Sequence, residues 1–246
     1  MPLKIREVQA RSILSKSGIT DYCVNCYMGC GFGCTYCYAQ LLIRKFHPNE
    51  EWGGYLDVKV NAPELLEREI KKAEKGVVML SSVTDPYQPF EKKYELTRKC
   101  LEILLKHDFP ITILTRSPLV MRDIDLLQQF RECTVGVSIT TDNDKIKNIF
   151  EPFTPPFRVR IETLKKLKDA GLRTYAFIGP MLPMDASAVG NAVSPNIDSA
   201  FIDKLNYPQL WKSIAEKHKL QLGKEFYERT RDELAAVFKE SGVMLC

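Results

Sequence analysis

Short apolar runs alternate with amphipathic helical patterns along most of the chain, and this alternation constrains the fold more than any other feature of the sequence. It is typical of βα units around a parallel sheet. The expected strands are residues 21–28, 76–81, 111–115, 134–140, 172–178 and 201–205. The periodicity predicts helices at residues 63–74, 94–107, 123–130, 158–170, 209–218 and 223–240.

The number of βα units then limits the architecture. About six units are expected, fewer than the eight of a closed barrel. The predicted fold is therefore α/β, a partial (βα)6 TIM-type barrel forming a single domain over residues 1–246. Its core is expected at residues 21–205 and its C-terminal helices at 207–241. Residues 185–198, rich in Ala, Ser, Asn, Gly and Pro, are expected to form a mobile loop that would act as a lid.

Composition narrows the class of protein without identifying a partner. Hydrophobic residues make up 45% of the 246 residues, but no apolar run reaches the ~20 residues that span a bilayer. We therefore expect a cytoplasmic protein with no membrane partner. The net charge of +4 comes from interleaved basic and acidic residues, so it neither requires nor excludes a polyanionic substrate.

Five of the eight cysteines lie between positions 23 and 37, which favours metal ligands in a reducing compartment over disulfides. Cys30, Cys34 and Cys37 are spaced by three and then two residues in a Gly-rich loop. A four-iron cluster usually takes four thiolates, so three would leave one iron open for chemistry. The alternative is a zinc site that adds Cys23 and Cys26, although zinc ribbons usually separate their two cysteine pairs by more residues.

With an aromatic residue before the third cysteine, this motif resembles the signature of the radical S-adenosylmethionine (SAM) superfamily. The resemblance extends over residues 21–183, and its branch looks like that of spore photoproduct lyase and DNA-photolyase-like proteins. The stretches that carry it are 25–39, Thr84-Asp85-Pro86-Tyr87-Gln88-Pro89, Thr115-Arg116-Ser117-Pro118, Ser138-Ile139-Thr140-Thr141 and Glu151-Pro152. It implies a [4Fe–4S] cluster on Cys30, Cys34 and Cys37, in the loop after the first strand.

The same resemblance implies which residues contact SAM. Tyr36 would meet the adenine, Thr84 and Asp85 the amino end, Arg116 the carboxylate, and Ser138 the ribose or carboxylate. Each residue also has a structural interpretation. Thr-Asp-Pro is good turn chemistry, an arginine at a strand end is often a solvated charge, and a strand serine often bonds only to backbone.

A separate question is which residue returns hydrogen to the substrate radical. Spore photoproduct lyases carry a hydrogen-donating cysteine at the position of Val83, whereas the tyrosines that accompany it are present as Tyr36 and Tyr38. We therefore assign Tyr38 and Cys26 as candidate catalytic residues, with simple packing as the alternative for Cys26. Strand side chains alternate, so only one of Cys23 and Cys26 is expected to face the cluster.

The resemblance implies an enzyme that cleaves SAM to a 5′-deoxyadenosyl radical, which abstracts hydrogen from a substrate such as a nucleic acid base or nucleotide. A peptide or small metabolite is the second possibility, and a non-catalytic electron carrier or zinc module is the third. The expected reductant is ferredoxin or flavodoxin. A nucleic acid enzyme would gather basic residues at the barrel mouth, where the candidates are Arg116, Arg122, Arg158 and Arg160. For Arg160, a solvated helix charge is the favoured interpretation over pairing with Glu151 or contact with the substrate.

Overall fold

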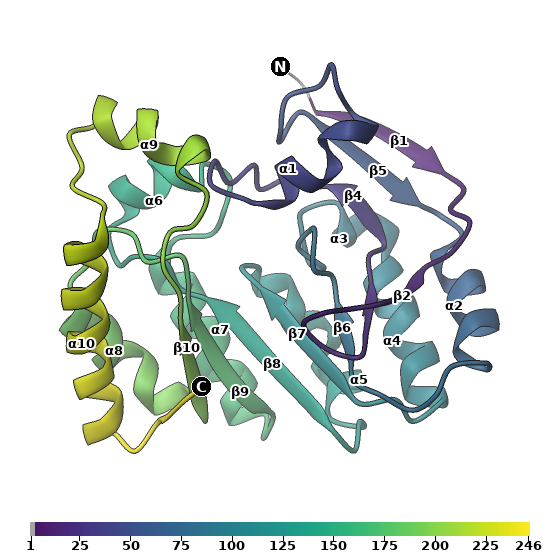
Figure 1. Cartoon of the computed structure of the whole chain (residues 1–246). Helices are drawn as coiled ribbons and strands as arrows, with labels where there is room; N and C mark the ends of the chain where they lie inside the picture. The colour runs from purple at the N-terminus through teal and green to yellow at the C-terminus, as the bar shows by residue number, and fades with distance from the viewer. Residues whose placement is uncertain (1–2) are drawn as a thin grey trace.

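The structure is a computed structural model that describes residues 3–246. The strands of its main sheet are β2 Leu14–Lys16, β3 Tyr22–Val24, β6 Val78–Leu80, β7 Ile111–Thr115, β8 Cys133–Ser138, β9 Arg173–Ile178, β10 Ser199–Ile202 and β11 Met244–Leu245. Their order is β11-β10-β9-β8-β7-β6-β3-β2, and the strands from β10 to β3 are parallel. The sheet curves into an open barrel with its helices on the outside (Figure 1). This confirms the predicted α/β partial barrel.

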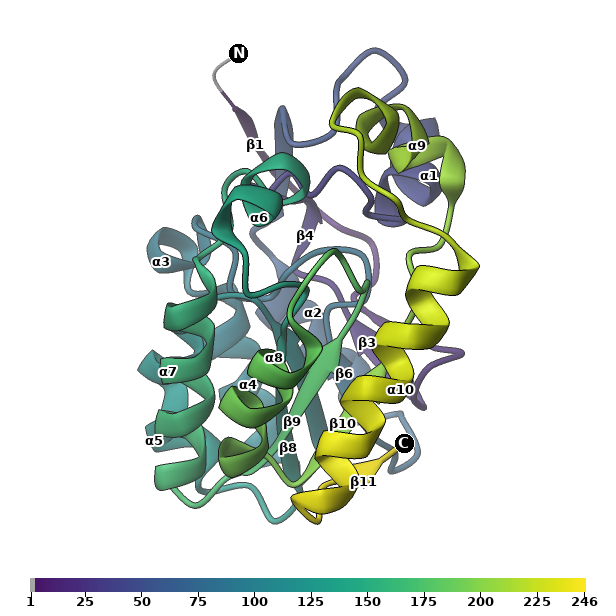
Figure 2. The ribbon, with the colours of Figure 1, turned by 90° about the vertical axis from the view of Figure 1, so that its left-hand side faces the viewer.

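Most of the helices cover the outer face of this sheet, and the others lie beyond the carboxyl ends of its strands (Figure 2). Their bounds are α1 Ala39–Ile43, α2 Ala62–Ile70, α3 Glu91–Tyr94, α4 Leu96–Lys106, α5 Ile124–Leu127, α6 Asp144–Phe150, α7 Phe157–Asp169, α8 Ala186–Val193, α9 Pro208–Lys217 and α10 Lys224–Glu240. Three short 3₁₀ turns are η1 Arg44–Phe46, η2 Pro118–Asp123 and η3 Ser194–Asn196. Within residues 3–246 we find no helix with the length and apolar character needed to cross a membrane.

Strand β7 shows how the two faces of the sheet are used. Ile111 and Ile113 are buried in the core between sheet and helices, because alternate side chains of a strand point to opposite faces. Thr112 and Leu114 point the other way and line a cavity inside the barrel. Residues that follow the strands at their carboxyl ends therefore surround the mouth of this cavity.

The first predicted strand, residues 21–28, is wrong as a single element. β3 pairs with β6 in the main sheet, whereas β4 Tyr27–Gly29 pairs with β5 Tyr55–Lys59 in a separate sheet of order β1-β5-β4, whose β1 spans Lys4–Val8. The chain changes sheets at Asn25 and Cys26. A run of eight apolar and polar residues gives no sign of such a break, since its pattern suits either one long strand or two short ones.

The predicted loop at residues 185–198 is also wrong. It contains helix α8, which begins where Asp185 accepts a hydrogen bond from the Ala188 amide at 2.9 Å, and the turn η3. α8 packs against α10 on the outer surface, far from a position over the barrel mouth (Figure 2). Its small residues permit this close packing, since Gly190 lies directly against Val237. The composition suggested a loop because small residues such as Ala, Ser and Gly do not produce the alternation of apolar and polar faces that marks a helix.

Candidate active site at the carboxyl ends of the strands

One cavity of about 670 Å³ begins at the cysteine loop and continues along the inside of the barrel. Cys30, Cys34 and Cys37 line one end of it. The lining also includes every residue predicted to contact SAM: Tyr36, Thr84, Asp85, Arg116 and Ser138. Folding therefore brings together residues that are more than a hundred positions apart in the sequence.

The cysteine loop is anchored by backbone contacts on both sides. The Thr35 amide donates to the Phe150 carbonyl at 2.8 Å, and the Trp52 indole Nε1 donates to the Cys34 carbonyl at 3.0 Å. Inside the loop, the Cys37 amide donates to the Cys34 carbonyl at 3.1 Å. These bonds fix the loop against α6 and against the segment before β5, so the three thiols are held on a preformed frame.

A glycine directly before the first thiol shapes the entry to this loop. Gly29 has a φ of +89°, and a Cβ there would lie 2.4 Å from the Tyr55 carbonyl oxygen. The Gly29 carbonyl also accepts a hydrogen bond from the Thr84 hydroxyl at 2.7 Å. Because only glycine adopts this backbone conformation easily and fits this close approach, the residue type is required for the loop to reach the β6 end.

Burial affects the chemistry of the three thiols. It raises the pKa of Cys30 to about 12, and it also raises the pKa of Cys34 and Cys37 above their ordinary values. All three are free of disulfides. A bound metal would supply the positive charge that favours the thiolate in such a site, so the loop suits metal ligation better than it suits a free nucleophile.

Thr84 and Asp85 line the cavity, and their side chains also form hydrogen bonds to neighbouring protein residues. The buried Asp85 carboxylate accepts hydrogen bonds from the Thr115 hydroxyl at 2.6 Å and the Arg116 amide at 2.8 Å. The Tyr87 amide, at 2.9 Å, completes the turn expected from the Thr-Asp-Pro sequence. Asp85 thus joins the end of β6 to the end of β7.

The Arg116 side chain is held by two neighbours at the cavity wall. Its Nε lies 3.2 Å from a carboxylate oxygen of Glu151, and its other guanidinium nitrogen donates to the Tyr36 hydroxyl at 3.2 Å. The Tyr36 hydroxyl in turn donates to Glu151. Burial raises the pKa of Tyr36 well above its ordinary value, so the phenol stays protonated and remains a donor.

Glu151 is completely buried and receives a second guanidinium, that of Arg160. Although burial alone would raise it, the pKa of Glu151 is lowered to about 2 by the neighbouring Arg160 and Arg116. Arg160 is only 2% exposed and also donates to the Ser138 carbonyl at 3.0 Å. The expectation of a solvated helix charge at Arg160 is therefore wrong, because the first turn of α7 points its side chain under the ends of the strands.

Ser138 provides a test of whether the site fits a polar cofactor. Its hydroxyl is fully buried, lies in the cavity wall at the end of β8, and has no hydrogen-bond partner within the described residues 3–246. A buried polar group without a partner costs about 1–3 kcal/mol, so such groups are normally satisfied. The residues present thus fit a ligand with polar groups at this strand end, beside the thiols and Arg116.

The remaining cysteines of the cluster region lie elsewhere. The Cys23 thiol donates to the Ser82 hydroxyl at 3.2 Å. Cys26 is 1% exposed in the hydrophobic core, with its sulfur 3.5 Å from that of Cys100. Neither lines the cavity with the other three thiols. The zinc-ribbon arrangement therefore lacks its first pair, and Cys26 has the packing position that the sequence left as the alternative to catalysis.

Further inside the barrel the cavity wall is rich in aromatic side chains. Tyr38 stacks on Tyr207, with ring centroids 6.3 Å apart, and donates to the Ser82 carbonyl. Tyr175 meets Phe201 edge to face at 5.5 Å. Tyr175 lies over Gly136, where a Cβ would come within 2.2 Å of the ring. Sequence patterns showed aromatic residues in the strands but not that they face the same cavity.

Two further residues in this wall bear on hydrogen return. Val83, which occupies the position of the lyase cysteine, lines the cavity. So does the exposed terminal Cys246, to which the sequence assigned no role. Strand β11 brings it there by pairing with β10. A two-residue strand at the end of a chain has no recognisable periodicity, so no sequence signal predicts this location.

Of the four arginines considered for a nucleic acid groove, Arg116 lines the cavity, whereas Arg122, Arg158 and Arg160 do not. Arg122 is paired with Glu91 at 2.8 Å, and Arg158 pairs with Glu162 at 2.9 Å on the outside of α7. Arg173 and Lys204 are the exposed cations among the cavity-lining residues.

Sequence comparison identifies relatives of this chain. An uncharacterized protein of Methanocaldococcus jannaschii is 31% identical over 99% of this chain and 96% of its own length. An uncharacterized protein of Acidianus two-tailed virus is 34% identical over 66% of this chain and 56% of its own length. A radical SAM Nα-GlyT isomerase of Pseudomonas phage M6 is 27% identical over 72% of this chain, which matches 36% of that enzyme.

Solved structures show a similar fold. Spore photoproduct lyase complexed with dinucleoside spore photoproduct superposes with a TM-score of 0.75 at 15% identity, covering 98% of this chain and 81% of the lyase. Streptococcus suis SuiB bound to SAM gives a TM-score of 0.64 at 13% identity, covering 100% of this chain and 50% of SuiB. At these identities the likeness concerns the fold alone.

The sequence profile of the radical SAM superfamily matches residues 24–187. These residues contain the three cysteines, the predicted SAM contacts and the strands that carry them. The cofactors characteristic of the superfamily are a [4Fe–4S] cluster and SAM. From this match and from the three thiols at one end of the cavity, we conclude that the chain belongs to the radical SAM superfamily and is a radical SAM enzyme.

Proposed function

We propose that Cys30, Cys34 and Cys37 hold the cluster and that SAM lies along the carboxyl ends of β6, β7 and β8. The observation that carries this proposal is the continuous cavity from the three thiols past Arg116 and the unpartnered Ser138 hydroxyl. Arg116 would bind the cofactor carboxylate with a guanidinium already oriented by Glu151 and Tyr36. When bound, the cofactors supply a radical that abstracts hydrogen from an unactivated carbon.

The protein residues exclude water and position the two partners. The thiol loop and the β6 end close one side of the cavity, and the aromatic wall of the barrel forms the other. A substrate that occupies the aromatic part would lie next to the cofactor in the same cavity. Proximity of this kind lowers the barrier of a hydrogen transfer and protects a radical from side reactions.

We propose a substrate that presents a planar ring, with the base of a nucleotide or of a short nucleic acid strand as the first candidate. Tyr175, Phe201 and Tyr207 offer faces and edges on which a base can stack. Lys204, two residues past the carboxyl end of β10, and Arg173, at the amino end of β9, would each face a different phosphate. With two such cations and the other arginines paired elsewhere, the site suits a short segment better than a long duplex.

An aromatic side chain of a peptide is the second candidate. The same wall favours it, because aromatic rings pack edge to face or offset on one another whatever molecule carries them. A peptide has no phosphate for Arg173 and Lys204, so the two candidates differ in how substrate binding depends on these cations. Tyr38 lines the cavity in either case and remains our candidate for hydrogen return, whereas the core position of Cys26 removes it from the proposal.

Anaerobic reconstitution with iron and sulfide, followed by reduction with dithionite, tests the cofactor assignment. We expect the wild-type protein to bind about four irons and to release 5′-deoxyadenosine from SAM. Replacing Cys30, Cys34 and Cys37 by Ala should abolish both the brown chromophore and this product. Cys133→Ala is the control, since Cys133 lies at the start of β8 and does not line the cavity. A cluster that persists in the triple variant contradicts the assignment.

Substrate class is tested by adding oligonucleotides or aromatic peptides to the reduced enzyme in heavy water and following deuterium in each. Label in a nucleotide that is lost in an Arg173→Ala, Lys204→Ala variant supports the first candidate. Label in a peptide, unaffected by the same double substitution, supports the second.

A further inference from the structure

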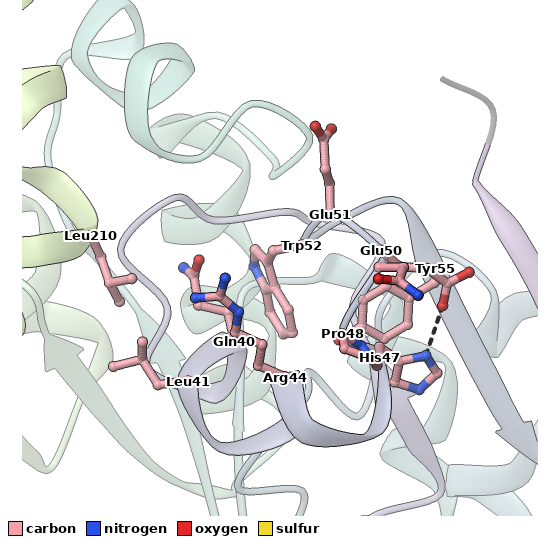
Figure 3. Close-up of a pocket in the computed structure, with 11 residues that line it drawn as sticks. Gln40, Leu41, Arg44, His47, Pro48, Glu50, Glu51, Trp52, Tyr55 and Leu210 are labelled. Carbon is pink, nitrogen blue, oxygen red and sulfur yellow. Dashed lines mark hydrogen bonds and ion pairs between the residues drawn. The ribbon is translucent and has the colours of Figure 1, made fainter.

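A second cavity, of about 420 Å³, opens on the outer side of the cysteine loop (Figure 3). We call it the outer groove. Its lining comprises Gln40, Leu41, Arg44, His47, Pro48, Asn49, Glu50, Glu51, Trp52, Tyr55 and Leu210. Its walls come from α1 and η1, from the segment that leads into β5 and from Leu210 of helix α9. None of the functions described so far uses this surface.

Trp52 connects the outer groove to the cluster. Its side chain lines both cavities, and its indole nitrogen donates to the Cys34 carbonyl at 3.0 Å. One aromatic side chain therefore separates the outer groove from a proposed cluster ligand. A surface this close to a proposed cluster ligand is suited to electron entry, because a single side chain bonded to the Cys34 carbonyl lies between the two cavities.

Residues Leu41 to Phe46, which we call the rim, supply Leu41 and Arg44 to the groove and expose further apolar side chains beside them. Leu42 is 53% exposed and Phe46 is 58% exposed, and Leu41 beside them is 37% exposed. They belong to α1, which begins two residues after Cys37, and to η1, which follows it directly. Exposed apolar residues gathered on one short element mark an interaction site more often than residues scattered singly do.

The same rim carries free positive charge. Arg44 and Lys45 are exposed, and neither forms an ion pair with another residue of the described chain. The acidic residues nearby are arranged differently. Glu50 is paired with Arg6 at 2.6 Å and with His47 at 2.7 Å, and Glu51, although it lines the groove, directs its carboxylate away from the other lining side chains (Figure 3). Arg44 and Lys45 therefore place two positive charges on the rim that have no ion-pair partner within the described chain.

We propose that the outer groove and its rim, Leu41 to Phe46, dock a small acidic one-electron carrier protein. The positive rim would steer an acidic surface, and the apolar side chains would form a small contact typical of transient redox complexes. One electron passes from the reduced carrier to the oxidised cluster, and the carrier leaves oxidised by one electron. This inference rests on the proposed cluster site and adds the place where its reductant binds.

The test compares two sources of electrons for the same enzyme. A reduced bacterial flavodoxin needs a docking surface, whereas dithionite reaches the cluster without one. Leu42→Glu and Lys45→Glu are made separately in the full-length reconstituted enzyme, and 5′-deoxyadenosine formation is measured with each reductant. Lys165→Glu is the matched control, because Lys165 is exposed on α7, away from the groove (Figure 2).

We expect each rim variant to lower the flavodoxin-driven rate by about tenfold, to leave the dithionite-driven rate within about twofold of wild type, and the control to change neither. The Lys45→Glu variant should also lose most of the salt dependence of the flavodoxin rate. Unchanged flavodoxin rates in both rim variants overturn the inference, as do equal losses with both reductants, which would indicate damage to the cluster loop. No product from wild type with dithionite would instead contradict the proposed cluster site itself.

Discussion

Two buried hydroxyl groups, those of Ser138 and Thr140, differ in whether they lie in the wall of the cavity. Ser138 ends β8 and Thr140 lies two residues further on, and both have buried hydroxyls without a partner in the described chain. Only Ser138 lines the cavity. Removing each hydroxyl in turn therefore tests whether the Ser138 hydroxyl binds the cofactor.

We predict that Ser138→Ala weakens SAM binding about three- to tenfold, which corresponds to about 0.5–1.5 kcal/mol for one hydrogen bond. The cluster absorbance should not change, because Ser138 is not a thiol ligand. Isothermal titration of the reconstituted protein with SAM measures the effect. Thr140→Val removes a comparable hydroxyl outside the cavity and should leave the affinity unchanged. Equal affinities in all three proteins would remove Ser138 from the proposed site.

Glu151 links the predicted carboxylate-binding arginine to the fold. It is completely buried between Arg116 and Arg160, which hold its pKa at about 2 against the 4.5 of an unperturbed glutamate. A group whose pKa is lower in the folded protein stabilises the fold above its unfolded pKa, and this contribution is lost as the pH falls toward the folded pKa.

We predict that about 3 kcal/mol of the unfolding free energy is lost through Glu151 between about pH 4.5 and 2. Glu151→Gln should be destabilised at neutral pH by about 3–5 kcal/mol, because two guanidiniums lose their anion, and should show a flatter acid profile. Urea denaturation at a series of pH values measures both. Glu162→Gln, on the exposed side of α7, is the control. Parallel pH profiles for wild type and Glu151→Gln would refute the assigned charge.

Among the elements, the short strand β4 decides where the cluster loop starts. It pairs with β5 in the small sheet, and Gly29 ends it with a left-handed backbone pressed against Tyr55. The small sheet therefore acts as the outer support of the thiol loop rather than as an N-terminal addition to the barrel.

We predict that Gly29→Ala lowers both thermal stability and iron content. The added methyl would lie 2.4 Å from a backbone oxygen and would favour a different φ, so β4 and the loop must shift, at a cost above about 1–2 kcal/mol. Iron analysis and a thermal melt of the anaerobic protein report both effects. Gly18→Ala, where nothing lies within 4 Å of the added atom, should behave as wild type. Full iron content in Gly29→Ala would contradict the role of this glycine.

For the whole molecule, the distribution of charge limits what kind of polyanion can bind. Of the cations considered from sequence, Arg122, Arg158 and Arg160 are held in ion pairs within the protein. Arg173 and Lys204 are exposed and line the cavity. Only a few phosphates can therefore be neutralised at the site.

We predict a shallow salt dependence if a short single-stranded oligothymidylate binds. Two cations give a slope of log affinity against log salt of about −1.4, since each phosphate contact on a single strand contributes about −0.7. Lys204→Gln should reduce the slope by about 0.7. Fluorescence anisotropy over a range of salt concentrations measures it. A slope steeper than about −4 would indicate a longer basic track than the structure contains.

The sequence alone determined the superfamily and the α/β class, and it predicted the candidate thiols and the positions of most parallel strands along the chain. These features depend on local spacing: cysteines close together in a flexible Gly-rich loop, and apolar periodicity within segments of five to eighteen residues. The strand at 111–115 illustrates this, because its predicted bounds equal those of β7. An element can be predicted from sequence when the residues whose spacing indicates it are the same residues that form it.

Only the tertiary structure decided how those residues work together. It separated Cys26 from the thiol loop by breaking the first strand, placed Arg160 under Ser138, and made Trp52 a wall shared by two cavities. In each case the deciding partner is distant along the chain. A buried charge or an aromatic wall exists only once several elements have packed, because desolvation and contact are properties of the assembled core and not of any one segment.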